Sequence, residues 1–294
     1  MPKDSLSHLR AKTAYLGYLG ASRAASLVPF GLAPVVGLIA GGAAYFTSAK
    51  RRSVVRRNLE PVLDGPNTRL EAMVQRAFVS YAQYWFEAFK IGYEDGSTLA
   101  GRGRAEGLEH LDAALREGKG AIVAAPHLGN WDFAAAWVDH RRYKVTAVAE
   151  RLEPTELFDW FVARRAELGV TVVPHDDDPM PKLVAALRRN EVVALVADRS
   201  IDAATVEVEF FGRTVEFPMG PAILALRTGA PILPTAAYFE PHGGHLLRVL
   251  PPLEIGERGR IREDARRLTQ EIAHSFEELI RRAPEQWHVF QPFF

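Results

Sequence analysis

At 294 residues the chain is long enough to bury a sizeable core, as one large α/β domain or as two smaller ones. Basic and acidic residues are equal in number, 36 of each, and the formal net charge of +0 excludes a global electrostatic attraction to nucleic acid. The absence of cysteine excludes disulfides, thiolate zinc sites and a cysteine nucleophile, and it fits a reducing cytoplasm.

The N-terminal region predicts helices against a membrane rather than a secretory signal. Charges scattered between Lys3 and Arg23 interrupt any short apolar core of the signal type. Residues 24–49 carry no charge and are long enough to cross a bilayer. Pro29 and Pro34, with several glycines, favour instead two short helices joined near Pro29, which lie in the membrane interface or pack on the body of the protein.

A basic cluster follows this apolar segment directly. Beside an apolar segment, such a cluster favours the anionic cytoplasmic leaflet of a membrane. The alternative interpretation is a buried helical pair followed by a solvated charged face. The members of the cluster are Lys50, Arg51, Arg52, Arg56 and Arg57.

The order of the predicted elements indicates an α/β fold with a helical N-terminal segment. Helices are expected throughout residues 1–95, including Thr68–Lys90, where apolar residues recur every three or four positions. From about Gly107 onward, short apolar runs alternate with amphipathic segments, which predicts a mostly parallel or mixed central sheet flanked by helices. The later runs follow one another more closely, so part of the sheet is expected to be antiparallel.

The expected strands are Ala121–Ala125, Val145–Ala149, Val170–Val173, Val192–Ala197, Val206–Phe211, Ile232–Tyr238 and Leu246–Leu250. The expected helices of this part are Gly107–Arg116, Trp131–Arg141, Pro154–Leu168, Met180–Asn190 and a long closing helix, Ile261–Arg282. No linker interrupts the chain. We therefore expect a single domain over residues 1–294, with a membrane-associating helical part (1–95) and an α/β catalytic core (105–294).

One short segment, with His127 followed five residues later by Asp132, carries the strongest chemical signal. It reads Pro-His-Leu-Gly-Asn-Trp-Asp over residues 126–132 and lies between an expected strand and an expected helix, where α/β proteins bind ligands. On one regular helix the two side chains would diverge by roughly 140°. If His127 lies in the loop and Asp132 in the first helical turn, the carboxylate can reach the imidazole, which is the arrangement of a general base.

The full segment resembles the H-x4-D motif of glycerolipid acyltransferases and, in this longer form, the bacterial lipid A lauroyl/myristoyl acyltransferase family. Further blocks of that family follow in the same order, so the resemblance extends from about residue 10 to the C-terminus. The blocks are Glu150-Arg151, the R-x3-G pair Arg165 and Gly169, Ala197-Asp198-Arg199 followed by Val206–Gly212, and Phe217–Ala222 with Gly229–Ile232.

Three details resemble one branch of the family, the actinobacterial phosphatidylinositol mannoside acyltransferases. They are the run Ala149–Pro154, the Asp198-Arg199 pair, where lipid A enzymes usually have Asp-Gln, and the aromatic ending Trp287–Phe294. The resemblance implies an O-acyltransferase that moves a long-chain acyl group, expected to be palmitoyl, from acyl-CoA to a mannose hydroxyl of a phosphatidylinositol mannoside. A lipid A or other glycerolipid acceptor is the alternative.

The resemblance also implies the surroundings of the reaction. His127 serves as the general base, acyl-CoA is a co-substrate, and no other cofactor or metal is expected. The partners are then a phosphoinositol-containing glycolipid and an anionic membrane surface, with no nucleic acid. The expected location is the cell membrane, peripherally on its cytoplasmic face. A serine nucleophile on a G-x-S-x-G elbow is absent from the sequence, which favours direct transfer without an acyl-enzyme.

Two carboxylates are secondary candidates. Glu207 and Glu150 follow expected strands within the blocks shared with the family, and either could bond a sugar hydroxyl or polarise His127. Each could equally be a solvated carboxylate at a strand end.

Two arginines are candidate phosphate ligands, because the guanidinium group suits bidentate contact with phosphate. Arg165 fits the R-x3-G spacing, although its neighbour Arg164 is as suitable on chemistry alone. Arg199 either holds a phosphate or forms a salt bridge with Asp198. The remaining histidines, His288 among them, are assigned to surface or packing roles.

Overall fold

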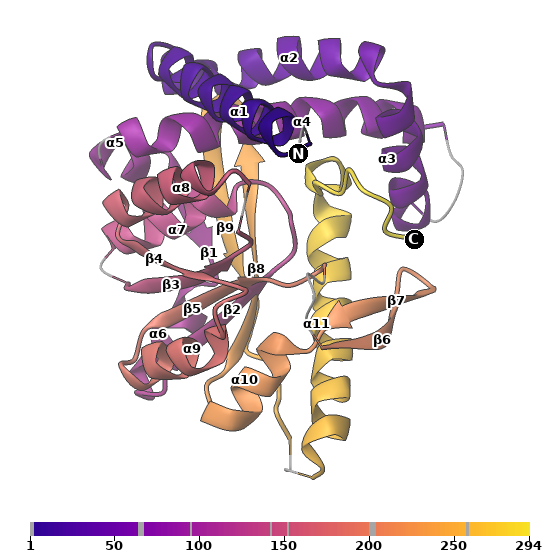
Figure 1. Ribbon diagram of the computed structural model, residues 1–294. Helices are drawn as coiled ribbons and strands as arrows, with labels where there is room; N and C mark the ends of the chain where they lie inside the picture. The colour runs from indigo at the N-terminus through magenta and orange to yellow at the C-terminus, as the bar shows by residue number, and fades with distance from the viewer. Residues whose placement is uncertain are drawn as a thin grey trace.

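The structure is a computed structural model, and it describes residues 3–63, 68–94, 96–141, 143–151, 153–199, 204–256 and 259–294. One residue of the blocks quoted above, Leu152, lies outside the described residues. The fold is α/β, as expected: a mixed, mostly parallel sheet flanked by helices, with a helical N-terminal segment at one end (Figure 1).

The central sheet has seven strands in the order β1-β9-β8-β2-β5-β3-β4. Five neighbouring strands run parallel, whereas β9 is antiparallel to β8 and β1 is parallel to β9. The strand bounds are β1 Gly103–Glu106, β2 Ala121–Ala125, β3 Val145–Ala149, β4 Val170–Pro174, β5 Val192–Val196, β8 Ile232–Glu240 and β9 Gly244–Val249. A separate antiparallel hairpin joins β6 (Thr205–Phe210) to β7 (Arg213–Pro218).

Successive residues of the central strands point to opposite faces of the sheet and so build two apolar layers. On β2, for example, Ile122 and Ala124 belong to one core, while Ala121 and Val123 pack into the other. The first core lies under α9 (Pro179–Arg188), α10 (Gly220–Thr228) and α11 (Ile261–Arg282). The second lies under α6 (Leu108–Arg116) and α7 (Trp131–His140), beside α8 (Thr155–Glu167).

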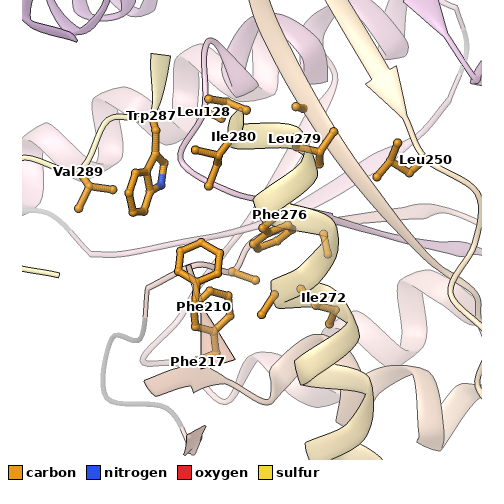
Figure 2. Close-up of a cluster of buried hydrophobic side chains, with 14 of the residues drawn as sticks. Leu128, Phe210, Phe217, Leu250, Ile272, Phe276, Leu279, Ile280, Trp287 and Val289 are labelled. Atoms are coloured by element: carbon orange, nitrogen blue, oxygen red, sulfur yellow. The ribbon is translucent and has the colours of Figure 1, made fainter. Parts of the chain in front are cut away.

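The first core joins the closing helix to the C-terminal tail. Phe276 and Ile280 of α11 lie on the side of the helix that faces Phe210 and Phe217 of the hairpin, with the Trp287 indole beside them (Figure 2). Every one of these side chains is at most 1% exposed. The short helix η4 (Pro284–Gln286) then directs the last residues back across the molecule. This packing brings the C-terminal tail next to the loop that follows β2.

The N-terminal helices form a layer across one end of the α/β body (Figure 1). They are α1 Lys3–Ser26, η1 Phe30–Leu32, α2 Ala33–Thr47, α3 Ala49–Val62 and α4 Leu70–Lys90, followed by η2 Ile91–Tyr93 and α5 Gly96–Ala100. The expected break near Pro29 is present, because α1 ends at Ser26 and η1 begins at Phe30. The short helix η3 (Pro241–Gly243) lies between β8 and β9.

The close contact between α2 and α4 depends on two glycines. A Cβ at Gly37 would lie 2.9 Å from Gln83 Cβ, and one at Gly41 would lie 2.5 Å from Val79 Cα. Larger residues at these two positions would therefore push the helices apart. One side of α2 rests on α4 in this way, while its other side is left exposed.

Candidate active site

His127 lies at the carboxyl end of β2, in the loop that leads into α7. Gly129 makes this loop possible: its φ of +64° is a left-handed conformation, and a Cβ there would collide with the carbonyl oxygen of Ala237. The Asn130 side chain then caps α7 by accepting the backbone N–H of Phe133 at 2.9 Å. The imidazole is thus presented from a short, well-supported turn, as expected from the motif.

The carboxylate beside His127 is Asp198. His127 Nδ1–H donates to Asp198 Oδ1 at 2.5 Å, and the His127 backbone N–H donates to Oδ2 at 3.0 Å. Asp198 comes two residues after β5, the strand that pairs in parallel with β2, so the two carboxyl ends meet at one edge of the sheet. With Nδ1 engaged, Nε2 is the ring nitrogen available to a substrate.

Trp287 completes the support of this carboxylate. Its indole Nε1–H donates to Asp198 Oδ2 at 2.8 Å, and both side chains are buried. Burial alone would raise the pKa of Asp198, but the facing His127 and these N–H donors lower it below its ordinary value. A carboxylate held ionised against one ring nitrogen fixes the tautomer of a general base and stabilises the imidazolium that forms.

Asp132 does not contact His127, and the expectation that it orients the imidazole is wrong. The first turn of α7 directs Asp132 toward α4 and α8 instead. Arg165 Nε donates to Asp132 Oδ1 at 2.7 Å and its Nη2 to Oδ2 at 3.3 Å, while the Tyr84 hydroxyl donates to Oδ2 at 3.1 Å. Burial and the neighbouring Asp132 charge raise the pKa of Tyr84 well above its ordinary value.

Of the two adjacent arginines, Arg165 is the one beside the motif. Burial opposes its charge, but Asp132 outweighs that effect and raises the pKa of the Arg165 guanidinium. Arg164 instead pairs with Glu167 at 2.8 Å and lies over the Tyr93 ring. Since Asp132 already accepts from Arg165, the pair holds α7 and α8 together at the edge of the cavity described below.

Glu150 and Arg199 lie near each other at the solvent side of the site. Arg199 Nη2 approaches Glu150 Oε2 at 3.4 Å, and Arg199 Nη1–H donates to Gln291 Oε1 at 3.0 Å. The salt bridge between Arg199 and Asp198, one of the two expectations for this arginine, is replaced by these contacts. Both charged side chains remain partly exposed, at 35% for Arg199 and 45% for Glu150.

Glu207 is placed elsewhere. It lies on an exposed position of β6, opposite Glu216 in the hairpin, and lines a shallow hollow against α11 with Thr214 and Gln270. The strand-end position expected from sequence is therefore wrong, because the run belongs to a separate two-stranded hairpin and not to the central sheet. A role for Glu207 in polarising His127 has no geometric support.

A cavity of about 450 Å³ opens beside His127. It passes between the sheet and the helices α6, α7 and α8, over the inner side chains of neighbouring strands such as Ala125, Ala147 and Ala194. Buried apolar side chains also line it, among them Leu111 and Leu247. Because the alanine side chain is a single methyl group, these strands leave room above them for a narrow apolar ligand.

His288 is a residue of this site that sequence reasoning assigned to surface or packing. It lines the cavity, its backbone N–H donates to the His127 carbonyl at 2.8 Å, and its Nε2 lies 2.9 Å from Ser80 Oγ. Burial, and secondly the nearby His127, lower the pKa of His288 to about 3. His288 is therefore neutral at ordinary pH and places no second positive charge beside His127.

Comparisons with known proteins place the whole chain among acyltransferases. The chain is 38% identical over 257 residues to a phosphatidylinositol mannoside acyltransferase of Mycobacterium tuberculosis. The aligned residues cover 85% of this chain and 79% of that protein. The chain is 34% identical over 281 residues to the protein of the same name from Mycolicibacterium smegmatis, covering 94% and 90% of the two chains. The family model of bacterial lipid A biosynthesis acyltransferases matches residues 2–294. The chain belongs to this acyltransferase family.

Proposed function

We propose that this protein transfers a long-chain acyl group, palmitoyl in the first instance, from acyl-CoA to a mannose hydroxyl of a phosphatidylinositol mannoside. One observation carries the proposal: His127, paired with Asp198, lines a largely apolar cavity. A general base at the mouth of an apolar cavity suits a reaction between a polar hydroxyl and the ester end of a fatty chain. The names of the relatives indicate the class of acceptor.

The proposed mechanism is direct transfer. His127 Nε2 takes the proton of the acceptor hydroxyl as its oxygen attacks the thioester carbon, and a tetrahedral intermediate forms. When the C–S bond breaks, the imidazolium returns that proton to the departing thiolate, so the products are an ester and a free thiol. Asp198 accepts Nδ1–H throughout and stabilises the transient positive charge. His288, neutral beside it, does not oppose that charge.

The acceptor headgroup is assigned to the polar mouth of the cavity. Glu150 offers an acceptor for sugar hydroxyls, and the Arg199 guanidinium offers donors to a hydroxyl or a phosphate. Both line the cavity together with Gln291. The Arg165 guanidinium is engaged with Asp132, so in this proposal it holds the motif in place rather than gripping a free phosphate.

The N-terminal layer is proposed to hold the site at a membrane surface. Phe30–Thr47 is apolar and, by length and composition, able to cross a bilayer, and only 22% of it is buried. The outer side of α2 exposes Leu38 at 61%, Ile39 at 69% and Phe46 at 73%. Because the opposite side rests on α4 through Gly37 and Gly41, the proposed position of α2 is flat in the interface.

The basic cluster of α3 follows this apolar surface. Lys50, Arg51, Arg56 and Arg57 are exposed, which suits contact with anionic lipid on the cytoplasmic face. Acceptor lipids would then reach the polar mouth of the cavity while their acyl chains stay in the membrane.

The proposal is tested with purified protein, palmitoyl-CoA and a mixture of acceptors, with the products identified by mass spectrometry. A phosphatidylinositol mannoside should gain one palmitoyl group, and omission of the acceptor should leave only slow thioester hydrolysis. Preferential acylation of a lipid A precursor, the alternative raised by the family model, would overturn the choice of acceptor. Equal thioester hydrolysis with and without any acceptor would overturn transfer itself.

A further inference from the structure

A carboxylate with no part in the proposed chemistry is buried next to the motif. Glu87 of α4 is 0% exposed. Its Oε1 accepts from Gln83 Nε2 at 2.9 Å, and its Oε2 accepts from Asn130 Nδ2 at 2.6 Å. His245 Nε2 lies 2.8 Å from the same Oε2. Three N–H donors therefore converge on one carboxylate in the interior.

Packing alone does not require this cluster. A buried carboxylate is costly unless it is hydrogen-bonded, so a carboxylate kept here with three donors suggests a role in specifying geometry. His245 is fixed from two sides: its ring stacks flat on Phe133 at 3.7 Å, and its backbone N–H donates to Arg102 O. The Nδ1 atom of His245 is buried without a partner. A bare lone pair there is less costly than an unpaired N–H, which favours the neutral ring with Nε2–H directed at Glu87.

Asn130 connects this cluster to the motif. Its Oδ1 accepts the Phe133 N–H at the start of α7, while its Nδ2 donates to Glu87. The two contacts permit a single orientation of the amide, since a flipped amide would place N–H against N–H and oxygen against carboxylate. The backbone N–H of Asn130 donates to Ala237 O at 2.8 Å. Asn130 is thus held at three points, and it is flanked by the loop of His127 and the helical turn of Asp132.

We propose that Glu87 is a positioning residue, which acts through Asn130 to set the start of α7 and with it the placement of His127 and Asp132. As a statement about catalysis, this rests on the function proposed above. The donor geometry suits a carboxylate, because both of its oxygens accept: Oε1 from Gln83, and Oε2 from Asn130 and His245. A displacement of the motif of about 1 Å can reduce turnover by about 10²-fold.

Two single variants separate shape from hydrogen bonding. Glu87→Gln keeps the oxygen that faces Asn130 and His245, and the flexible Gln83 amide can turn to accept from the new NH₂ group, so turnover should fall by less than about fivefold. Glu87→Leu keeps the size but leaves the Asn130 NH₂ without an acceptor. Its kcat should fall by about 10²-fold, with KM for both substrates little changed.

An exchange of donor and acceptor provides the rescue. Asn130→Asp keeps the cap on α7 but sets a second carboxylate against Glu87, so kcat should fall at least as far as in Glu87→Leu. In the double variant Glu87→Gln/Asn130→Asp, the amide introduced on α4 donates one N–H to the carboxylate introduced at the cap. Its second N–H faces His245 Nε2, which accepts it only in the tautomer that leaves a buried Nδ1–H unpaired, so the rescue is partial. The double variant should recover tenfold or more of the turnover lost in Asn130→Asp.

The control variant is Leu268→Ala, in the separate apolar cluster with Leu226 and Ala265. The kcat of each variant is measured at the same number of degrees below that variant's own thermal unfolding midpoint. Amide hydrogen exchange gives a measurement independent of activity: in Glu87→Leu the amides of Phe133 and Ala134 should exchange faster while α11 is unchanged. Unchanged exchange, kcat in Glu87→Leu no lower than in the control, or a double variant no better than Asn130→Asp would overturn the inference. Faster exchange in a protein that transfers no acyl group even as wild type would refute the proposed function alone.

Discussion

Replacing Asp198 with asparagine should disable the general base, His127, while a side chain of almost the same shape still fills the space beside it. Oδ2 of Asp198 accepts two N–H groups, from the His127 backbone and from the Trp287 indole. In Asp198→Asn the amide oxygen must take that place, because an NH₂ group there would face two donors. The NH₂ group then faces His127 Nδ1, which must become the acceptor. The ring proton moves to Nε2, the nitrogen that has to take the hydroxyl proton.

Activity should therefore be lost because His127 is held in the wrong tautomer. Such a change at a histidine–aspartate pair lowers kcat by about 10⁴-fold. The assay is single-turnover transfer of labelled palmitoyl from CoA to a phosphatidylinositol mannoside, with the fold checked by thermal unfolding. Asp132→Asn is the matched control: it weakens the contact with Arg165 but leaves the tautomer of His127 unchanged. Turnover in Asp198→Asn within tenfold of wild type, or a larger loss in Asp132→Asn, would refute the reasoning.

Three further predictions concern the cavity, the membrane surface and the buried histidine. Ala194→Leu should fill part of the cavity and shift preference toward shorter acyl-CoA chains by about tenfold or more in kcat/KM; an unchanged chain-length profile would place the acyl chain elsewhere. The double change Leu38→Glu/Ile39→Glu should weaken sedimentation with anionic vesicles by about 10²-fold or more without altering thermal stability, whereas unaltered vesicle binding would exclude α2 as the contact surface. Because burial lowers the pKa of His288 to about 3, its stabilising contribution is intact above pH 6.5 and is lost as the pH falls toward 3, by up to about 1.4 kcal/mol per pH unit. The unfolding free energy of His288→Gln, which can keep a bond to Ser80, should therefore decline less steeply between pH 6 and 4, and equal slopes in the two proteins would contradict this assignment.

The fold was predictable wherever local pattern decided the structure. The apolar run 121–125 and the amphipathic run 261–282 were expected at the bounds that β2 and α11 have. Strands β1 and β7 were missed because neither carries an apolar run. β1 reads Gly-Arg-Ala-Glu and pairs at the edge of the sheet. In β7, polar and apolar residues alternate within the hairpin.

The site was predictable only in part, since its second half depends on the order of strands in the sheet. His127 was identified from its motif, but Asp198 lies 71 residues further along the chain. Only the parallel pairing of β2 with β5 brings the two together, and no spacing in the sequence reveals that pairing. Asp132 was chosen because it is near in sequence, yet the first turn of α7 directs it to Arg165.

The central claim is that His127 is the base for acyl transfer at the mouth of the cavity. Its most direct test is the single-turnover rate of palmitoyl transfer to a phosphatidylinositol mannoside in His127→Ala, measured beside wild type at equal enzyme concentration and with the fold verified. The account predicts a loss of about 10³-fold or more, with binding of palmitoyl-CoA retained. Transfer by His127→Ala within tenfold of wild type would contradict it.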